Sequence, residues 1–387
     1  MGREFDYKQL KRKYDDFAAP MADITINDMK LSENKFNIVA TDLEVELTSE
    51  LEASTAEFRL YNVFDSEKKE FRIQDIKKYI FLGSAVSVSL GYRGAVKMIF
   101  SGYIAKVSFQ YEPEDVPFIE ITCMDIKGVM MASNYSRQLK AKTYSEAVKE
   151  IFQAVNYEKL KNIGVVDSRM NIQDTPDTVE AKRSSDKNKE TDETMEMVAE
   201  SDYEFLVKAA KKFGFEAYTE GKVFNFIKAM SNTGVLIALQ IGGGLLGFDI
   251  SYETAGMVEQ VEVRGMDTGK GKVISAKKKY QGKLSIGNKA KPLIKNTRYV
   301  FHDAGIRSQN RAQDRAEALM QEISCRLGTL KAECIGMPEL VPGRFVEIKG
   351  LGKPAANTFY ITKVRHILNE TKGYRSILYG KVDSQTT

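Results

Sequence analysis

The stretch GSAVSV at residues 83–88 decides the fold, because it opens three blocks that return later in the chain. YIAKV at 103–107 and FIEI at 118–121 follow it, and the second set is GRFVEI at 343–348, YITKV at 360–364 and YRSI at 374–377. The step from glycine to tyrosine is 20 residues in the first copy and 17 in the second, and the step to the last block is 15 and 14. Each copy predicts a glycine turn and three strands with one core-facing side. Five-residue matches between β-meanders arise by chance, but the shared order and spacing favour an internal duplication.

Short apolar runs surround the first copy between residues 21 and 125, and turn residues separate them. The runs are Ile24/Ile26, Ile38, Leu43/Val45/Leu47, Phe58/Leu60, Val86/Val88/Leu90 and Phe118/Ile119/Ile121. Strands of this length and regularity predict a barrel or a sandwich. Between the two copies, capping boxes mark two helix starts, because their side chains satisfy free backbone N–H groups. They are Thr143 with Glu146 and Ser201 with Glu204; a third helix is expected at 308–327, before Gly328.

The length of 387 residues predicts two to three domains. We expect a mainly β fold with an α+β middle region: two similar tube-type β-barrel domains, capped helices and a smaller α/β domain. The expected boundaries are 1–19 for an N-terminal arm, 20–138 for the first barrel, 139–248 for the middle domain and 249–387 for the second barrel, which includes the helix at 308–327.

Two segments of this chain are poor in apolar residues. Residues 177–196 carry charges of both signs and no aromatic side chain, so a flexible insertion is expected at about 166–199. The arm at 1–19 is charged with a few aromatic residues. It is either a mobile terminus or a segment that packs on a neighbouring subunit.

The residue types that usually carry catalysis are scarce. His302 and His366 are the only histidines, and His366 lies within an expected strand, where it should pack or form hydrogen bonds. Cys123, Cys325 and Cys334 have spacings that favour buried free thiols over a disulfide or a metal site. We therefore expect no catalytic residue, no cofactor and no metal site.

Two glycine-rich stretches and the overall charge are features that could indicate a binding site. GMDTGKG at 265–271 is one residue short of a phosphate loop and has no Ser or Thr after its lysine, so a basic hairpin turn is expected. GGG at 242–244 predicts a turn or bulge. The 57 basic and 53 acidic residues nearly balance, which gives no reason to expect direct nucleic-acid recognition. The start of the chain has no signal-peptide pattern, and no apolar run is long enough for a membrane span.

Three longer stretches carry a family likeness. FSGYI at 100–104 leads to IEITCMD at 119–125, ESDYEFL at 200–206 leads to FGF at 213–215, and GMPELVPG at 336–343 leads to YITKVRH at 360–366. Together they resemble the phage late control protein D family, the tail hub proteins of contractile phages and related particles. The likeness covers about residues 20–385.

The resemblance implies a structural, non-enzymatic baseplate hub of a contractile phage, an R-type bacteriocin or an injection system. Such hubs are homotrimers that join a hexameric tail tube to a trimeric spike, and two barrels in each of three chains would supply six quasi-equivalent modules. The implied partners are a tail tube or tube-initiator protein, a separate central spike protein, other baseplate (wedge) proteins and, as a further candidate, a tape measure protein. The spike is expected to be separate because spike relatives in type VI secretion carry further domains after the hub region, whereas this chain stops at Thr387.

The same likeness implies where the protein is made and where it is assembled. We expect synthesis in the bacterial cytoplasm, assembly into the baseplate and release on lysis. Two other functions stay open. A tail-associated cell-wall hydrolase needs only two carboxylates, and the 53 acidic residues cannot exclude such a pair. A carbohydrate-binding protein at the tail periphery is the third hypothesis.

Overall fold

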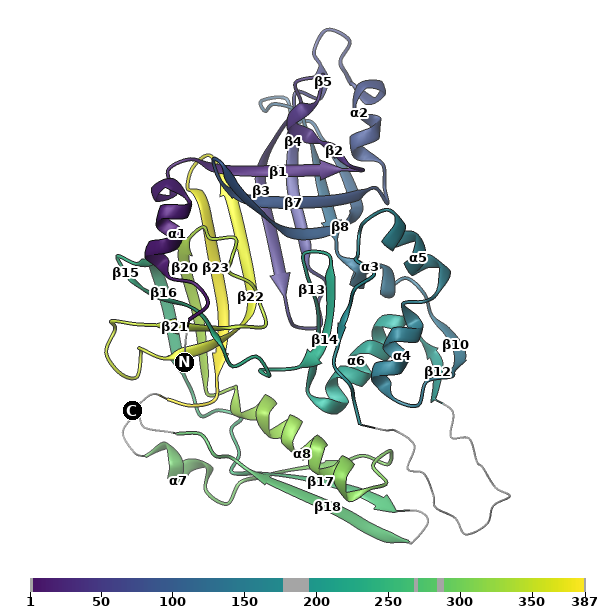
Figure 1. Cartoon of the computed structure of the whole chain (residues 1–387), viewed down its shortest axis with the longest axis vertical. Helices are drawn as coiled ribbons and strands as arrows, with labels where there is room; N and C mark the ends of the chain where they lie inside the picture. Colours follow the sequence, from purple (N-terminus) through teal and green to yellow (C-terminus); the bar gives the residue numbers. More distant parts are fainter. Residues whose placement is uncertain (1–2, 177–194, 268–270, 284–288, 386–387) are drawn as a thin grey trace.

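The structure is a computed structural model that describes residues 3–176, 195–267, 271–283 and 289–385. The chain is mainly β, with 45% strand and 21% helix, as predicted. Figure 1 shows a strand-rich upper and left part, a helical middle part at the right and a small α/β unit at the bottom.

Six strands from the C-terminal part close a mixed β-barrel. They are β15 (Val235–Ile241), β16 (Gly244–Tyr252), β20 (Gly328–Ile335), β21 (Phe345–Ile348), β22 (Thr358–Asn369) and β23 (Gly373–Val382). Around the barrel the order is β15-β21-β22-β23-β20-β16, and β16 returns to β15. Only the two pairs that contain β15 are parallel. Burial alternates along β23, so one side of the strand fills the barrel.

The N-terminal part repeats this strand order as an open sheet. Its strands are β1 (Pro20–Ile26), β2 (Met29–Lys30), β3 (Val39–Thr48), β4 (Thr55–Tyr61), β7 (Ala85–Tyr92), β8 (Ala95–Gln110) and β9 (Phe118–Met124). Apart from the two-residue β2, the order is β1-β7-β8-β9-β4-β3, with all neighbours antiparallel. Within the described strands β1 and β3 do not pair. The short turn η2 (Leu31–Glu33) contacts both strands. Because β1 and β3 do not pair, this half is not closed by hydrogen bonds as the barrel is.

The two halves share a local geometry as well as a strand order. Ala85 lies opposite Tyr103, and Phe345 lies opposite Tyr360. In both copies the amide of the turn glycine donates to the residue after the tyrosine, over 2.9 Å from Gly83 to Ile104 and 2.9 Å from Gly343 to Ile361. A register shift then follows in both strands, between Ile104 and Lys106 and between Ile361 and Lys363. The first two sequence blocks are therefore aligned correctly.

The predicted alignment of the third block is wrong by one residue. Tyr103 lies opposite Met124 and Tyr360 opposite Lys381, which makes Arg375, not Tyr374, the counterpart of Phe118. The sequence alignment paired one aromatic residue with another. In the structure, the equivalent residues are those that face the same side of the strand.

The turn glycines give a matched prediction. Gly83 and Gly343 have φ of +80° and +78°, but a Cβ on Gly83 would meet nothing within 4 Å, whereas one on Gly343 would lie 2.5 Å from the Tyr218 hydroxyl. Gly83→Ala should cost about 1 kcal/mol from backbone strain alone. Gly343→Ala should cost about 2–4 kcal/mol because the clash adds to the strain. Urea unfolding of both variants checks this; equal losses would contradict it.

Strand β22 joins the two halves. One edge of its C-terminal part pairs with β23, and the other edge pairs with β3 from Lys363 opposite Thr48 to Leu368 opposite Leu43. The barrel and the open sheet are thus one continuous hydrogen-bonded sheet, with a single apolar core along it.

A helical unit occupies the middle of the chain. It contains α3 (Ile126–Met130), β10 (Tyr135–Leu139), α4 (Tyr144–Ile151), α5 (Val155–Asn162), β11 (Asn171–Ile172), β12 (Met195–Glu200), α6 (Asp202–Phe213), β13 (Phe215–Glu220) and β14 (Val223–Lys228). Both predicted capping boxes are present, and Gly214 ends α6 in the left-handed conformation.

The predicted flexible insertion at about 166–199 is too wide at both ends. Val166 is buried, β11 pairs with β14, and residues 195–199 belong to β12, which pairs with β10. Residues with apolar contacts and a strand partner are held in place whatever the charge of their neighbours. The remaining part of that prediction, 177–194, lies outside the described residues.

A small α/β unit interrupts the barrel sequence between β16 and β20. Its elements are β17 (Gln260–Asp267), β18 (Lys272–Lys279), α7 (Ala290–Ile294), β19 (Arg298–His302) and α8 (Gln309–Ser324). Helix α8 packs on β17 and β18 through the apolar face predicted for it, and it ends three residues before the predicted Leu327. The glycine-rich stretch at 265–271 lies between two antiparallel strands, because β17 ends at Asp267 and β18 begins at Lys272; its residues 268–270 lie outside the described residues.

The N-terminal arm packs on its own chain, so it is not the mobile terminus that was one of its two predicted alternatives. Helix α1 (Tyr7–Lys13) buries Leu10, and Tyr14 follows it in the core. The Tyr14 hydroxyl donates to Glu339 over 2.6 Å, and the amide of Phe5 donates to the carbonyl of Leu236 over 2.9 Å. Leu10 and Tyr14 are four residues apart, so both face the barrel. The triple glycine forms the expected turn beside this arm, and a Cβ on Gly244 would lie 2.9 Å from the Tyr7 ring.

Candidate assembly surface

Strand β13 carries a buried junction between the middle unit and the barrel. Glu216, on β13, accepts a hydrogen bond from the Tyr360 hydroxyl of β22. Both side chains are buried. Burial raises the pKa of Glu216 to about 7, although the Tyr360 hydrogen bond and the Lys381 charge act in the opposite direction. A carboxyl group that is neutral over part of the physiological range thus sits between two structural units.

A second buried polar group joins the open sheet to the same strand. Asp125, at the end of β9, accepts from the amides of Ser54 and Lys127 and from the Thr219 hydroxyl, over 3.1, 3.0 and 3.2 Å. The Lys127 ammonium donates to the carbonyls of Glu50 and Ala217 over 3.1 and 3.2 Å. Burial lowers the pKa of Lys127. These contacts fix the angle between the middle unit and the sheet.

His366 lies at the β22–β3 junction and is fully buried. Its Nε2 is 3.1 Å from the Leu340 carbonyl, and its Nδ1 is 2.9 Å from the Tyr374 hydroxyl and 3.0 Å from the Ser376 hydroxyl. Burial lowers its pKa to about 4. The predicted packing and hydrogen-bonding role is confirmed. His302 lies on β19, on an exposed strand of the small unit.

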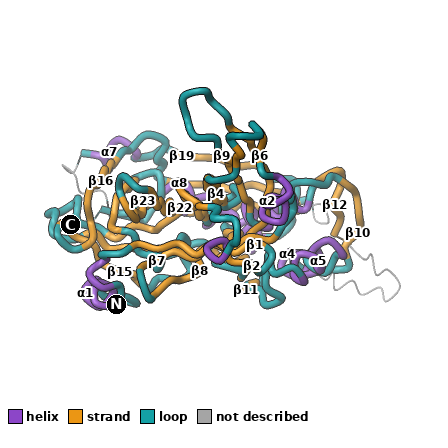
Figure 2. Tube along the Cα trace, turned by 90° about the horizontal axis from the view of Figure 1, so that it is seen from above, coloured by secondary structure: helices purple, strands orange, loops and turns teal. Residues whose placement is uncertain are grey.

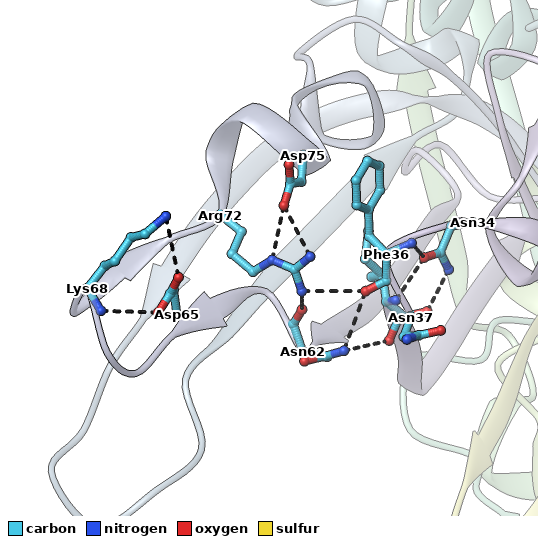
Figure 3. A network of polar contacts seen from close by, with 9 residues as sticks. Asn34, Phe36, Asn37, Asn62, Asp65, Lys68, Arg72 and Asp75 are labelled. Carbon is cyan, nitrogen blue, oxygen red and sulfur yellow. Dashed lines mark hydrogen bonds and ion pairs between the residues drawn. The ribbon is translucent and has the colours of Figure 1, made fainter.

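The far end of the open sheet is ordered by polar contacts (Figure 3). Arg72 donates to Asp75 over 3.1 Å and to the Asn62 carbonyl over 3.4 Å, while Asn34 accepts from the amide of Ile38 over 2.8 Å. The segment carries β5 (Phe64–Asp65), β6 (Glu70–Phe71) and α2 (Ile73–Ile80). Its rings lie against the end of β8: Phe71 is 5.1 Å from Phe109, and Phe64 is 5.6 Å from Tyr111.

Among the strand edges of the described chain that have no hydrogen-bonding partner, two lie on long strands of the large sheet. The first is the edge of β8 beyond Tyr103, where β7 has ended, and the second is the edge of β16 beyond Leu245, where β15 has ended. Their side chains include exposed apolar groups: 48% of Phe109 is exposed, 62% of Tyr111 and 44% of Phe248. Unpaired edges with apolar side chains are typical of surfaces that add a further strand.

Sequence reasoning missed these edges. Its only signal was the alternation of apolar residues after Val107, which predicts a buried strand in the same way as the alternation along β22 does. Whether an edge is paired depends on distant strands, so a local pattern cannot reveal it.

The grooves on the surface of the described chain are open, and carboxylates line some of them, such as Asp42, Glu44, Glu57 and Glu120 in one groove. A groove of about 480 Å³ lies at the seam between β1 and β3, lined by apolar residues such as Ile24, Leu43 and Leu368. Among the residues that the structure describes, no group of three His, Cys, Asp or Glu could hold a metal ion. Cys123, Cys325 and Cys334 are free and buried, as predicted, and burial raises the pKa of each thiol. None of the described helices is both long and apolar enough to span a membrane.

The fold is that of phage tail proteins. The tail protein from Neisseria meningitidis MC58 matches with a TM-score of 0.65 and 11% identity, over 94% of this chain and 97% of that one. The 43 kDa tail protein of prophage MuSo2 from Shewanella oneidensis matches with a TM-score of 0.63 and 11% identity, over 93% and 97%. The E. coli c3393 protein, a type VI secretion component with structural similarity to the T4 tail proteins gp27 and gp5, matches with a TM-score of 0.53 and 10% identity, over 92% and 76%. The likeness to tail hub proteins seen in the sequence is confirmed at the level of the fold.

Residues 18–370 match the family model described as the Alg8 N-terminal domain, so the chain belongs to that family. That description names no activity. No protein with curated annotation matches the sequence.

Proposed function

We propose that this chain is the structural baseplate hub of a contractile phage tail or a tail-like particle. In this role it is a homotrimeric adaptor between a hexameric tail tube and a trimeric central spike. The observation that carries the proposal is a six-strand order that occurs twice in one chain with a phage tail protein fold. Three chains would supply six similar modules for a six-fold tube, while the three-fold axis remains available to the spike.

The proposed duplication divides the chain into two modules and a middle unit. We assign residues 20–125 to the first module, and residues from α3 to β14 to the middle unit in place of the predicted 139–248, because Ile126, Met130 and Leu139 belong to its core. The second module begins at Val235, because β15 is one of the barrel strands. The buried Glu216–Tyr360 and Asp125 contacts support a hub whose modules keep a fixed relative angle.

The proposed role is structural and not enzymatic. The partners that fit it are a tube or tube-initiator protein, a separate spike, wedge proteins and a tape measure protein. Carboxylates that line an open groove do not by themselves favour a hydrolase, and no observation on the described residues favours a carbohydrate-binding protein.

The mass of the purified chain in solution tests the trimer. We expect about three times the 43.6 kDa chain mass by native mass spectrometry, and co-purification with a tube or spike protein from the same particle. A map of the assembled particle should locate the chain on its central axis. A strict monomer that binds neither partner, or a peripheral position, would overturn the proposal.

A further inference from the structure

The two halves of the chain meet through a strand pairing whose equivalents lie unpaired elsewhere on the molecule. Residues 363–368 of β22 pair antiparallel with residues 43–48 of β3. The core-facing side chains at this junction are fully or almost fully buried: Leu43, Val45, Leu47, Val364 and His366.

The shared register identifies the equivalent segments. Tyr103 corresponds to Tyr360, and both strands shift register after the next residue. Residues 106–111, the end of β8 and the residue after it, therefore correspond to 363–368 of β22. Ala56 and Leu330 pair with equivalent residues of β9 and β23, and Val45 pairs with Ala56 as Ile250 pairs with Leu330. Residues 248–253, the end of β16 and the residue after it, therefore correspond to 43–48 of β3.

Both equivalent segments have a free edge, and their side chains are not buried as those of the internal junction are. Phe109 corresponds to His366 and Phe248 to Leu43, yet Phe109 is 48% exposed and Phe248 44%, whereas His366 is 0% and Leu43 3%. Phe81, which is 53% exposed, precedes its turn glycine as Val341, at 5%, precedes Gly343. In Figure 1, β8 lies to the right and β16 to the left of the strands that join the halves, and β16 and β8 also lie on opposite sides of β22 when the molecule is seen from above (Figure 2).

We propose that residues 106–111 of one copy pair antiparallel with residues 248–253 of a second copy. The contact reproduces between molecules the β22–β3 junction that exists within each one. It names the interface of the proposed trimer and rests on that proposal for the number of copies in the ring.

The two segments are complementary in this register. Transferring the β22–β3 pairing places these residues opposite one another: Lys106 and Glu253, Val107 and Tyr252, Ser108 and Ser251, Phe109 and Ile250, Gln110 and Asp249, Tyr111 and Phe248. Apolar side chains meet on one face, and the one pair with two charges is of opposite sign. A shift by one residue would turn each apolar face toward a polar one.

The contact is head-to-tail, because the two surfaces differ. Such contacts build a ring when the rotation closes and a fibre when it does not. In such a ring, a junction within a chain alternates with a junction between chains, and each chain contributes two modules. Three copies therefore give six modules. The free edges of β8 and β16 are then both paired, which removes the aggregation hazard that an exposed edge presents.

Cysteine cross-linking tests the register. Ser108→Cys/Ser251→Cys in the full chain should form disulfides under mild oxidation, giving covalent species up to three chains on a non-reducing gel. Each single variant should stay uncross-linked, because position 108 faces position 251 and not itself. A mixture of the two single variants should give covalent dimers only. The native cysteines are buried and should not interfere.

A charge exchange tests the same pairing without a covalent bond. Lys106→Glu should weaken association about tenfold, and Lys106→Glu/Glu253→Lys should restore it. A native trimer in which the folded cysteine pair stays uncross-linked, and in which the exchange gives no rescue, would overturn the edge pairing and leave the hub proposal standing. A protein that stays monomeric but still binds its tube and spike partners would overturn the pairing and the trimer together.

Discussion

Tyr360→Asp is expected to lower the free energy of unfolding by at least about 4 kcal/mol, enough to leave little folded protein. The Tyr360 side chain is 1% exposed, its ring packs 5.1 Å from that of Phe345, and its hydroxyl donates to Glu216. An aspartate there would remove the ring, leave a cavity and place a second carboxyl beside a buried one. Urea unfolding of the soluble fraction, with circular dichroism to follow strand content, measures the loss.

Tyr360→Phe is the matched control. It keeps the ring and removes only the donor to Glu216, so we expect a loss of about 1–3 kcal/mol from an unsatisfied buried carboxyl. If the phenylalanine and aspartate variants were equally stable, the cost would not come from the buried carboxyl and the lost ring.

Tyr103 and Tyr360 occupy equivalent positions in the two sequence copies, so the sequence predicts that an aspartate at either position would be a buried charge. In the structure, however, the two tyrosines have different surroundings. Tyr103 is only half-buried, and no carboxylate accepts from its hydroxyl. Tyr103→Asp should therefore cost about 1–2 kcal/mol and leave a folded chain. Equivalent positions in a repeated module need not have equivalent surroundings, because Tyr360 faces the middle unit through β13.

Features coded within a few residues were predictable from the sequence. The capping boxes at Thr143 and Ser201, the stop at Gly214 and the glycine turns at 83 and 343 depend on local geometry, and the structure has all of them. Alternating apolar residues likewise marked the strands, since one face of each is buried.

Features that depend on distant partners were not predictable. The arm could not be placed, because the residues that bury Tyr14 lie far along the chain: its ring is 5.3 Å from that of Tyr92, and its hydroxyl donates to Glu339. Nothing local distinguishes the C-terminal part of β22, which pairs on both edges, from the C-terminal part of β8, which pairs on one. The Glu216–Tyr360 contact joins residues 144 positions apart, so only the fold reveals it.

The contribution of Glu216 to stability should fall as the pH rises through neutrality. Its folded pKa of about 7 lies above the value near 4.3 of an exposed glutamate. The folded state therefore holds the proton more tightly than the unfolded chain. The resulting stabilisation is fully present below about pH 4 and is lost as the pH rises through 7. Linkage limits the loss to about 3 kcal/mol between pH 5 and pH 8.

Glu216→Gln should remove most of this slope, since the amide cannot ionise and still accepts from Tyr360. The difference in the free energy of unfolding between the unmodified chain and Glu216→Gln should therefore shrink by up to about 3 kcal/mol from pH 5 to pH 8. The comparison is needed because the buried His366, whose pKa is lowered to about 4, is easier to protonate in the unfolded chain and weakens both proteins below about pH 6. In the unmodified chain this loss opposes the gain from Glu216, but it cancels in the difference. Glu220→Gln is the control, because Glu220 lies on the same strand but is exposed, and it should keep the pH dependence of the unmodified chain. A difference between the unmodified chain and Glu216→Gln that did not change from pH 5 to pH 8 would show that the junction carboxyl is not the group that titrates.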